Sequence, residues 1–250
     1  MAVSGEASAD GHVHQVELFR SADLVVRKVG GFSRDALVVT FDSFTDRQDP
    51  HTNYGDLDRP GFGEHFLREH AVDAAHVIGR DNIWYQYPEM PAAMAAIATA
   101  ARSYQRVISY GSSMGGYAAI RFGGAAGAEA ALAISPQFSL DPHVVRFERR
   151  WETPARTIDF ALERNWTPPF VATSYILYDP RNLDRRHVAL FAKRGRVVRV
   201  PVPDSGHSAA FFLADCGLLQ RAVLDVARDT FDPAALRRDA AAFGRSSDGA

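Results

Sequence analysis

Apolar and polar positions along the chain follow two different periods. Residues 36–41 are almost continuously apolar, as expected for a strand buried on both faces of a sheet. Shorter alternating stretches at 14–19 and 24–29 predict an antiparallel hairpin at a sheet edge. Further strands are predicted at 74–79, 105–110, 130–135, 172–178 and 196–202, and helices at 63–71, 90–102, 114–123, 182–193, 208–227 with a break near Gly217, and 233–243. Repeated strand–helix units imply an α/β fold with a mostly parallel central sheet and helices on both faces.

The segments without a helix or strand pattern indicate how the chain is divided into domains. Small and polar residues at 1–11 and 244–250 predict flexible ends around a single domain at 12–243. The longest interruption, 136–170, carries large aromatic residues among charges. Because a long loop in a compact domain tends to be functional, this segment is expected to form a small cap over the sheet edge.

Composition narrows the class of protein. The 250 residues are 46% hydrophobic and 23% charged, which is ordinary for a globular protein. The formal net charge of -2 predicts no basic patch, so nucleic acid is not an expected partner. No stretch approaches the ~18 apolar residues of a membrane span, and the first residues lack a signal-peptide pattern. We therefore expect a cytoplasmic protein without membrane association.

A candidate nucleophile lies between the strand predicted at 105–110 and the following helix. The sequence Gly111-Ser112-Ser113-Met114-Gly115 separates an apolar, β-branched run from an Ala-rich stretch. In this strand–turn–helix context, Gly-x-Ser-x-Gly presents its serine at the carboxyl edge of the sheet, beside a helix N-terminus. Ser113 is therefore predicted to be a nucleophile. The alternative is a Ser/Gly-rich turn that packs closely against a neighbour.

A serine nucleophile needs a general base, and His207 is the best placed of the nine histidines. It lies in a small Gly-containing loop after the strand at 196–202, so its imidazole can reach across the strand ends. Histidine supplies a neutral base near physiological pH. His51 and His143, which lie in predicted loops, remain alternatives.

The imidazole in turn needs a carboxylate to set its tautomer and to stabilise its charged form. Asp179 closes the aromatic strand at 172–178 and therefore lies at the same sheet edge as Ser113 and His207. We predict Asp179 as this acid, although a turn aspartate before Pro180 is the alternative. Asp204 is the main rival, and Asp184 is interpreted as a first-turn helix charge.

The remaining site residues come from loops at the same sheet edge. Catalysis also needs an oxyanion hole, for which we predict the backbone N–H of Met114 and that of Ser43 or Phe44, after the strand at 36–41. The segment after 74–79 contributes aromatic side chains that either line a substrate cleft or simply pack the loop. These side chains are Trp84, Tyr85 and Tyr87.

The order Ser113, Asp179, His207 on successive strand ends, with the turn at Gly111–Gly115, resembles the α/β-hydrolase superfamily over about residues 13–230. The resemblance implies that the acid follows the second strand after the nucleophile and that the histidine follows the next one. One feature departs from the lipase–esterase branch: the loop at 41–47 contains no His-Gly-Gly-Gly. The substrate class of that branch therefore does not transfer.

Together these residues predict a serine hydrolase that cleaves a carboxylic ester or thioester of a small or acylated substrate through an acyl-enzyme. No metal and no organic cofactor is expected. Two alternatives remain open: an acyltransferase that uses the same triad, and a catalytically silent binding protein with this fold. A peptidase has no specific support. The sequence leaves the oligomeric state open.

Overall fold

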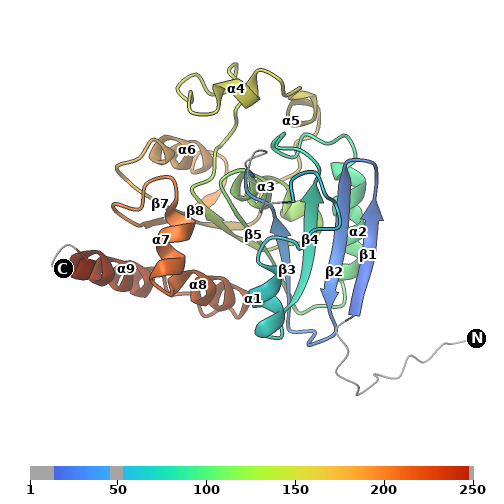
Figure 1. Ribbon diagram of the computed structural model, residues 1–250, viewed down its shortest axis with the longest axis horizontal. Coiled ribbons are helices and arrows are strands. Elements are labelled where there is room, and N and C mark those ends of the chain that lie inside the picture. Colours follow the sequence, from blue (N-terminus) through green and yellow to red (C-terminus); the bar gives the residue numbers. More distant parts are fainter. Residues whose placement is uncertain (1–13, 46–52, 248–250) are drawn as a thin grey trace, which may run out of the picture.

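An open, eight-stranded sheet forms the centre of the molecule (Figure 1). The computed structural model describes residues 14–45 and 53–247. The strand order is β1-β2-β4-β3-β5-β6-β7-β8; β1 and β2 are antiparallel to their neighbours, and all other pairs are parallel. The strands are β1 His14–Arg20, β2 Leu24–Gly30, β3 Ala36–Phe41, β4 Asp73–Gly79, β5 Arg106–Ser112, β6 Ala130–Ile134, β7 Thr173–Tyr178 and β8 Arg196–Pro201.

The helices cover both faces of this sheet. The α-helices are α1 Glu64–Glu69, α2 Met90–Ala101, α3 Met114–Phe122, α4 Glu152–Ala155, α5 Ala161–Asn165, α6 Asp184–Phe191, α7 Ala209–Asp215, α8 Leu218–Ala227 and α9 Pro233–Ser247, with a 3-10 turn at Gly124–Ala126. Helices α2, α3 and α6 contribute to one apolar cluster, and α1, α7, α8 and α9 contribute to the other.

Alternation within the strands explains the two clusters. In β3, Leu37, Val39 and Phe41 belong to the cluster with α2 and α3, whereas Ala36 and Val38 face the opposite one. Successive side chains of a strand point to opposite faces, so a strand covered on both sides must be apolar throughout. The continuous apolar runs of the sequence follow from this two-sided burial.

The predicted fold class is confirmed, and the element boundaries agree to within a few residues. The predicted hairpin is β1–β2, and the predicted break near Gly217 separates α7 from α8. The sequence pattern missed the two short helices α4 and α5, which lie between β6 and β7. Helix α9 continues to Ser247, past the expected end at 243. The predicted flexible tail was 244–250, and its first four residues belong to α9. The predicted flexible N-terminus at 1–11 and residues 248–250 of the tail lie outside the described residues.

The segment at 136–170 lies beyond the carboxyl end of the sheet. Figure 1 shows α4 and α5 above the ends of the parallel strands, next to the loops that follow them. In such sheets, sites gather where the strands end. We refer to residues 136–170 as the cap; that this segment covers a site stays a prediction. Across the described residues, no helix has both the length and the hydropathy to cross a membrane.

One buried histidine makes the stability of the fold depend on pH. His76 in β4 is fully buried, and its Nδ1 lies 2.7 Å from the hydroxyl oxygen of Thr40. Burial, helped by the positive charge of Arg27, lowers the pKa of His76 to about 4, against an opposing effect of the Glu64 carboxylate. The folded protein therefore keeps this imidazole neutral where the unfolded chain would protonate it.

The free energy of unfolding should accordingly fall as the pH drops from about 6.5 towards 4. Above the unfolded-state pKa the contribution of His76 is fully present, and it is lost as the pH falls through the folded-state value. The shift corresponds to up to about 3 kcal/mol. Urea unfolding of the wild type and of His76→Gln between pH 4 and 7 measures how the free energy of unfolding changes with pH. This change should be smaller in the variant. His65→Gln is the control, because that side chain is 90% exposed. Equal slopes in all three proteins would contradict the assignment.

Candidate active site

Ser113 occupies a sharp turn between β5 and α3. Its backbone is in an unusual conformation, with φ 52° and ψ -115°, and its N–H donates to the carbonyl of Ile134 at 2.8 Å. A Cβ on Gly111 would collide with the backbone of Gly115, and a Cβ on Gly115 would collide with the carbonyl of Phe41. The two glycines are therefore required by space, and the strain at Ser113 is of the kind found at functional turns.

His207 lies against Ser113, as the sequence predicts. The distance from Ser113 Oγ to His207 Nε2 is 2.9 Å, and the imidazole side chain is 24% exposed. The loop after β8 is held by two bonds: the Ser205 hydroxyl donates to the carbonyl of Val202, and the Gly206 N–H donates to a side-chain oxygen of Asp179. These bonds fix the residue next to His207 and thereby its approach to Ser113.

The carboxylate that contacts His207 is Asp184. Its Oδ2 lies 2.8 Å from His207 Nδ1, and the side chain is fully buried. Asp184 is the first residue of α6 and shares its buried face with His187, Val188 and Phe191. The side chain is thus directed inward, to the imidazole, and does not act only as a charge at the helix N-terminus.

The structure does not place Asp179 in this role. Both of its carboxylate oxygens accept backbone N–H groups, Oδ1 from Arg181 at 2.8 Å and Oδ2 from Gly206 at 2.9 Å. Asp179 therefore stabilises the turn after β7 and the loop that carries His207. This role resembles the alternative named above, in which Asp179 is a turn aspartate before Pro180. Asp204, the other rival, is exposed and pairs with Arg181.

A charged group of the 136–170 segment holds the Asp184 carboxylate from the other side. Arg150 donates to Asp184 Oδ1 at 2.7 Å and to Glu148 at 2.6 Å. Glu148 is desolvated, which would raise its pKa, but hydrogen bonds from His187 and Arg150 outweigh this and hold its pKa at about 2. Asp184, which contacts His207, is thus bonded through Arg150 to the 136–170 segment.

The predicted oxyanion residues lie close together. Met114 begins α3, and Met114 and Ser43 line the same small cavity. The carbonyls of Phe41 and Asp42 lie so close to Gly115 that the loop after β3 borders the helix start directly. The amide of Asn82 clamps this loop by bonding both the N–H and the carbonyl of Thr45, at 3.0 Å and 2.6 Å.

All three predicted substrate-binding aromatics, Trp84, Tyr85 and Tyr87, are core residues. Tyr85 is 1% exposed and donates its hydroxyl hydrogen to the carbonyls of Asp42 and Val77. Tyr87 is 3% exposed, donates to the carbonyl of Asp81 and accepts its N–H. Both hydroxyls are occupied by the backbone, so these rings pack the loop and do not form an open cleft.

Trp84 also belongs to an aromatic group beside His207. Its ring centroid lies 5.9 Å from that of Phe44 and 5.5 Å from that of Trp151, and the Trp151 ring lies 5.7 Å from the imidazole of His207. Phe44 also packs on Trp151, at 4.9 Å. The cap therefore contributes an aromatic side chain, Trp151, that the sequence did not assign to the site.

Gln137 is the second residue that the sequence did not assign. It follows β6 and is completely buried, and its Nε2 lies 3.1 Å from Ser113 Oγ and 3.3 Å from His207 Nε2. One signal was available: Gln137 is a polar residue just after a parallel strand, at the edge where the other site residues lie.

The other candidates lie elsewhere. His143, an alternative base, is exposed and lies in the loop whose backbone bonds Asp141. His51 lies outside the described residues. Within residues 14–45 and 53–247, no group of three or more His, Cys, Asp or Glu side chains is arranged to hold a metal ion.

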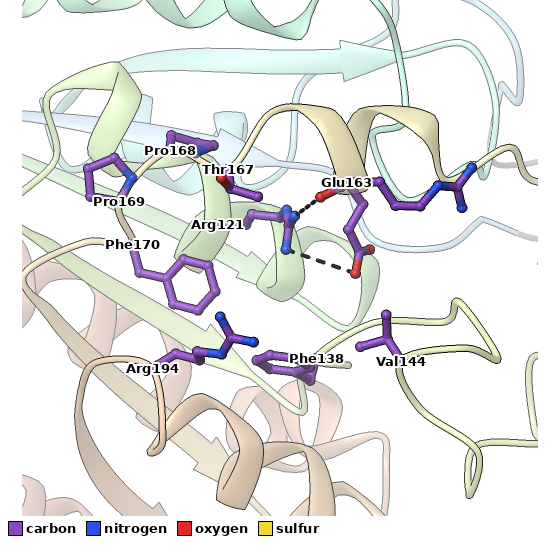
Figure 2. A pocket seen from close by; sticks show the side chains of 10 residues that line it. Arg121, Phe138, Val144, Glu163, Thr167, Pro168, Pro169, Phe170 and Arg194 are labelled. Carbon is purple, nitrogen blue, oxygen red and sulfur yellow. Dashed lines mark hydrogen bonds and ion pairs between the residues drawn. The ribbon is translucent and has the colours of Figure 1, made fainter.

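A separate cavity of about 410 Å³ is lined mainly by residues of the 136–170 segment, together with Arg121 and Arg194 (Figure 2). Arg121 reaches Glu163 there, and its guanidinium donates to the Glu163 carbonyl at 2.6 Å. Arg164 pairs with Asp141 at 3.0 Å. The lining residues are Arg121, Phe138, Val144, Glu163, Arg164, Thr167, Pro168, Pro169, Phe170 and Arg194. The three residues of the Ser–His–Asp arrangement are not among them.

Comparison with solved structures identifies the fold. A thermophilic carboxylesterase from a metagenomic library matches with a TM-score of 0.55 and 16% identity, over 92% of this chain and 89% of that chain. An esterase of Pyrobaculum calidifontis gives 0.55 and 12%, over 91% and 85%. The capsule O-acetyltransferase of Neisseria meningitidis serogroup A gives 0.55 and 12%, over 86% and 97%.

No protein-family model and no curated protein matches the sequence. At these identities, the structural likeness establishes the fold and not the activity. The chain has the α/β-hydrolase fold that the nucleophile turn and the strand order predict.

Substitution of the two aspartates separates their roles. Asp184→Asn should lower kcat by roughly 10³-fold or more, because asparagine favours the wrong tautomer and does not stabilise the imidazolium. Asp179→Asn should cost stability, about 1–2 kcal/mol from weakened backbone hydrogen bonds, and lower kcat by less than about tenfold. Ester hydrolysis and thermal unfolding of both variants provide the comparison. A large loss of kcat in Asp179→Asn together with a nearly unchanged kcat in Asp184→Asn would show that the two roles are reversed.

Proposed function

We propose that the protein is a serine hydrolase that cleaves a carboxylic ester or thioester through an acyl-enzyme. The observation that supports this most strongly is the hydrogen-bonded series Ser113–His207–Asp184, with distances of 2.9 Å and 2.8 Å, at the carboxyl edge of a parallel sheet. A hydroxyl, an imidazole and a buried carboxylate in this order are what nucleophilic acyl transfer requires.

In the proposed reaction, Ser113 Oγ attacks the acyl carbonyl carbon while His207 Nε2 takes the hydroxyl proton. Asp184 keeps the proton of His207 on Nδ1 and stabilises the imidazolium that forms. The backbone N–H of Met114, with that of Ser43 or Phe44, holds the negative oxygen of the tetrahedral intermediate. Collapse of the intermediate expels the alcohol or thiol, which receives the proton from His207.

Water then releases the acid in a second round of the same chemistry. His207 takes a proton from the water as it attacks the acyl carbonyl, and returns it to Ser113 Oγ when the ester bond to the enzyme breaks. The partly exposed rings of Phe44 and Trp151, which pack on each other beside His207, supply an apolar wall for an acyl or leaving group. An acylated small molecule is therefore the expected class of substrate.

Acyl transfer to a hydroxyl acceptor is the second candidate. The O-acetyltransferase of Neisseria meningitidis has the same TM-score, 0.55, as the esterases, and the match covers 97% of its chain. Both reactions use the same acyl-enzyme, and they differ only in whether water or an acceptor hydroxyl attacks it.

Ser113→Ala should abolish turnover of p-nitrophenyl esters, to below about a thousandth of the wild-type rate. It should also abolish covalent labelling by a fluorophosphonate, which reacts with an activated serine. Mass spectrometry of the labelled peptide locates the adduct. Ser112→Ala is the control, because this neighbouring serine is similarly buried and does not bond His207. Retention of a tenth of the activity by Ser113→Ala would overturn the proposed function.

Hydrolysis predicts that acid and p-nitrophenol form in equal amounts from p-nitrophenyl acetate, even when an oligosaccharide or polyol is added. Quantification of acetate and of acetylated acceptor in the same reaction tests this. A shortfall of acetate matched by acetylated acceptor would show that transfer, the second candidate, is the activity.

A further inference from the structure

The side-chain amide of Gln137 touches both reacting groups of the proposed mechanism. The residue lies three positions after the end of β6, beyond Ser135, whose φ is 45°. Its Nε2 is 3.1 Å from Ser113 Oγ and 3.3 Å from His207 Nε2, and its Oε1 accepts the indole N–H of Trp84 at 3.2 Å. The side chain is completely buried, so water does not compete for these bonds.

Trp84 determines which way the amide points. An indole nitrogen is a donor only, so the atom that faces it must be the amide oxygen of Gln137. The amide nitrogen, with two hydrogens, then faces Ser113 and His207. The oxygen is also the more distant of the two amide atoms from Ser113 Oγ, at 3.5 Å against 3.1 Å for the nitrogen.

The direction of the remaining hydrogen bonds follows from the protonation of His207. When its Nδ1 carries the proton and donates to Asp184, Nε2 has one lone pair to offer. Ser113 Oγ is closer to this lone pair than the Gln137 amide is, at 2.9 Å against 3.3 Å. The serine hydroxyl therefore donates to His207, and the Gln137 amide donates to the serine oxygen.

The result is a single directed series of donors. Trp84 donates to Gln137, Gln137 to Ser113, Ser113 to His207, and His207 to Asp184. Hydrogen bonds in such a series polarise one another, and they are stronger in a buried site of low dielectric constant. Each donor in it favours release of the Ser113 proton to His207.

We propose that Gln137 is a catalytic residue that stabilises the negative charge on Ser113 Oγ during acyl transfer, and that Trp84 is the residue that positions it. This inference rests on the proposed function. In acylation the proton passes from Oγ to His207 Nε2 while Oγ bonds the acyl carbon and the carbonyl electron pair moves to its oxygen. In deacylation the bond between Oγ and the acyl carbon breaks, and Oγ recovers the proton from His207. The Gln137 amide donates to Oγ at both points.

Removal of the donor provides the main test. Gln137→Leu removes the amide and keeps a similar volume, so kcat should fall by about 10- to 1000-fold, as for other lost donors to a developing charge. KM should change by less than about threefold. Gln137→Glu, a variant of the same shape, should also lose kcat. Its negative charge favours the protonated imidazole, so the acid limb of its pH–rate profile should move to higher pH.

Gln86→Leu is the matched control for a structural role. Gln86 is also a buried glutamine, and its amide donates to the Trp84 carbonyl and the Tyr117 hydroxyl but does not contact Ser113. This variant should lose stability by about as much as Gln137→Leu, yet keep kcat within about threefold. Equal kcat losses in the two variants at equal losses of Tm would overturn the proposal.

A double-mutant cycle tests the part assigned to Trp84. Trp84→Phe keeps an aromatic ring and removes the N–H, and should lower kcat by about three- to tenfold. Added to Gln137→Leu, it should cost little further, because Trp84 acts through Gln137. If the kcat losses of the two single variants add fully in the double variant, the positioning role of Trp84 is refuted.

The outcomes also separate this inference from the function on which it rests. Wild-type kcat in both Gln137→Leu and Gln137→Glu, together with an inactive Ser113→Ala, would refute the role of Gln137 and leave the serine mechanism standing. An active Ser113→Ala would refute both.

Discussion

The close approach of β5 to α3 is the constraint on which the rest of the site depends. Gly111 and Gly115 face one another without room for a Cβ, and Gly115 also lies against the carbonyl of Phe41. This contact accompanies the positive φ of Ser113, whose Oγ lies 2.9 Å from Nε2 of His207. It also brings the loop after β3 to the first turn of α3. One steric contact thus places both the candidate nucleophile and the N–H groups assigned to the oxyanion.

Two buried aspartates hold His207 in different ways. Asp179 uses both oxygens on backbone N–H groups and so holds the loop of His207, whereas Asp184 contacts the imidazole itself. Arg150, from the segment between β6 and β7, bonds Asp184 in turn. The cap is therefore joined to the Ser–His–Asp arrangement by charge as well as by the ring of Trp151. A displacement of Arg150 or Trp151 is consequently expected to alter the position of the His207 imidazole.

Buried polar side chains connect the site to the cap by a second route. Gln137 bonds Trp84, and Gln86 bonds the Trp84 carbonyl, the N–H of Glu163 and the Tyr117 hydroxyl. Burial raises the pKa of Glu163, while the charge of Arg121 opposes this shift. Because an unpaired polar group is costly in such an interior, a connected set of this kind holds its members in one arrangement.

The sequence by itself determined the fold, and it predicted that Ser113 and His207 lie at one sheet edge, where the structure has them in contact. Two-sided burial of a strand, the helical period and a turn that admits only glycine are local properties, so β3, the paired helices α7 and α8 and the turn at Ser113 could all be read from neighbouring residues. His207 followed because the loop after β8 is short and ends at the same sheet edge. These features depend on chain geometry over a few residues, and the structure retains them.

Tertiary structure alone decided which side chains meet. Asp179 and Asp184 both lie near the end of β7, and only the inward direction of the first turn of α6 brings Asp184 to His207. One local signal existed, since Asp184 shares the apolar face of α6. Tyr85 and Tyr87 follow β4 as expected but pack in the core, and Gln137, which is also fully buried, contacts Ser113. A hydrogen-bond partner depends on the direction of a side chain and on what the rest of the fold places opposite it, and no period along the chain encodes that.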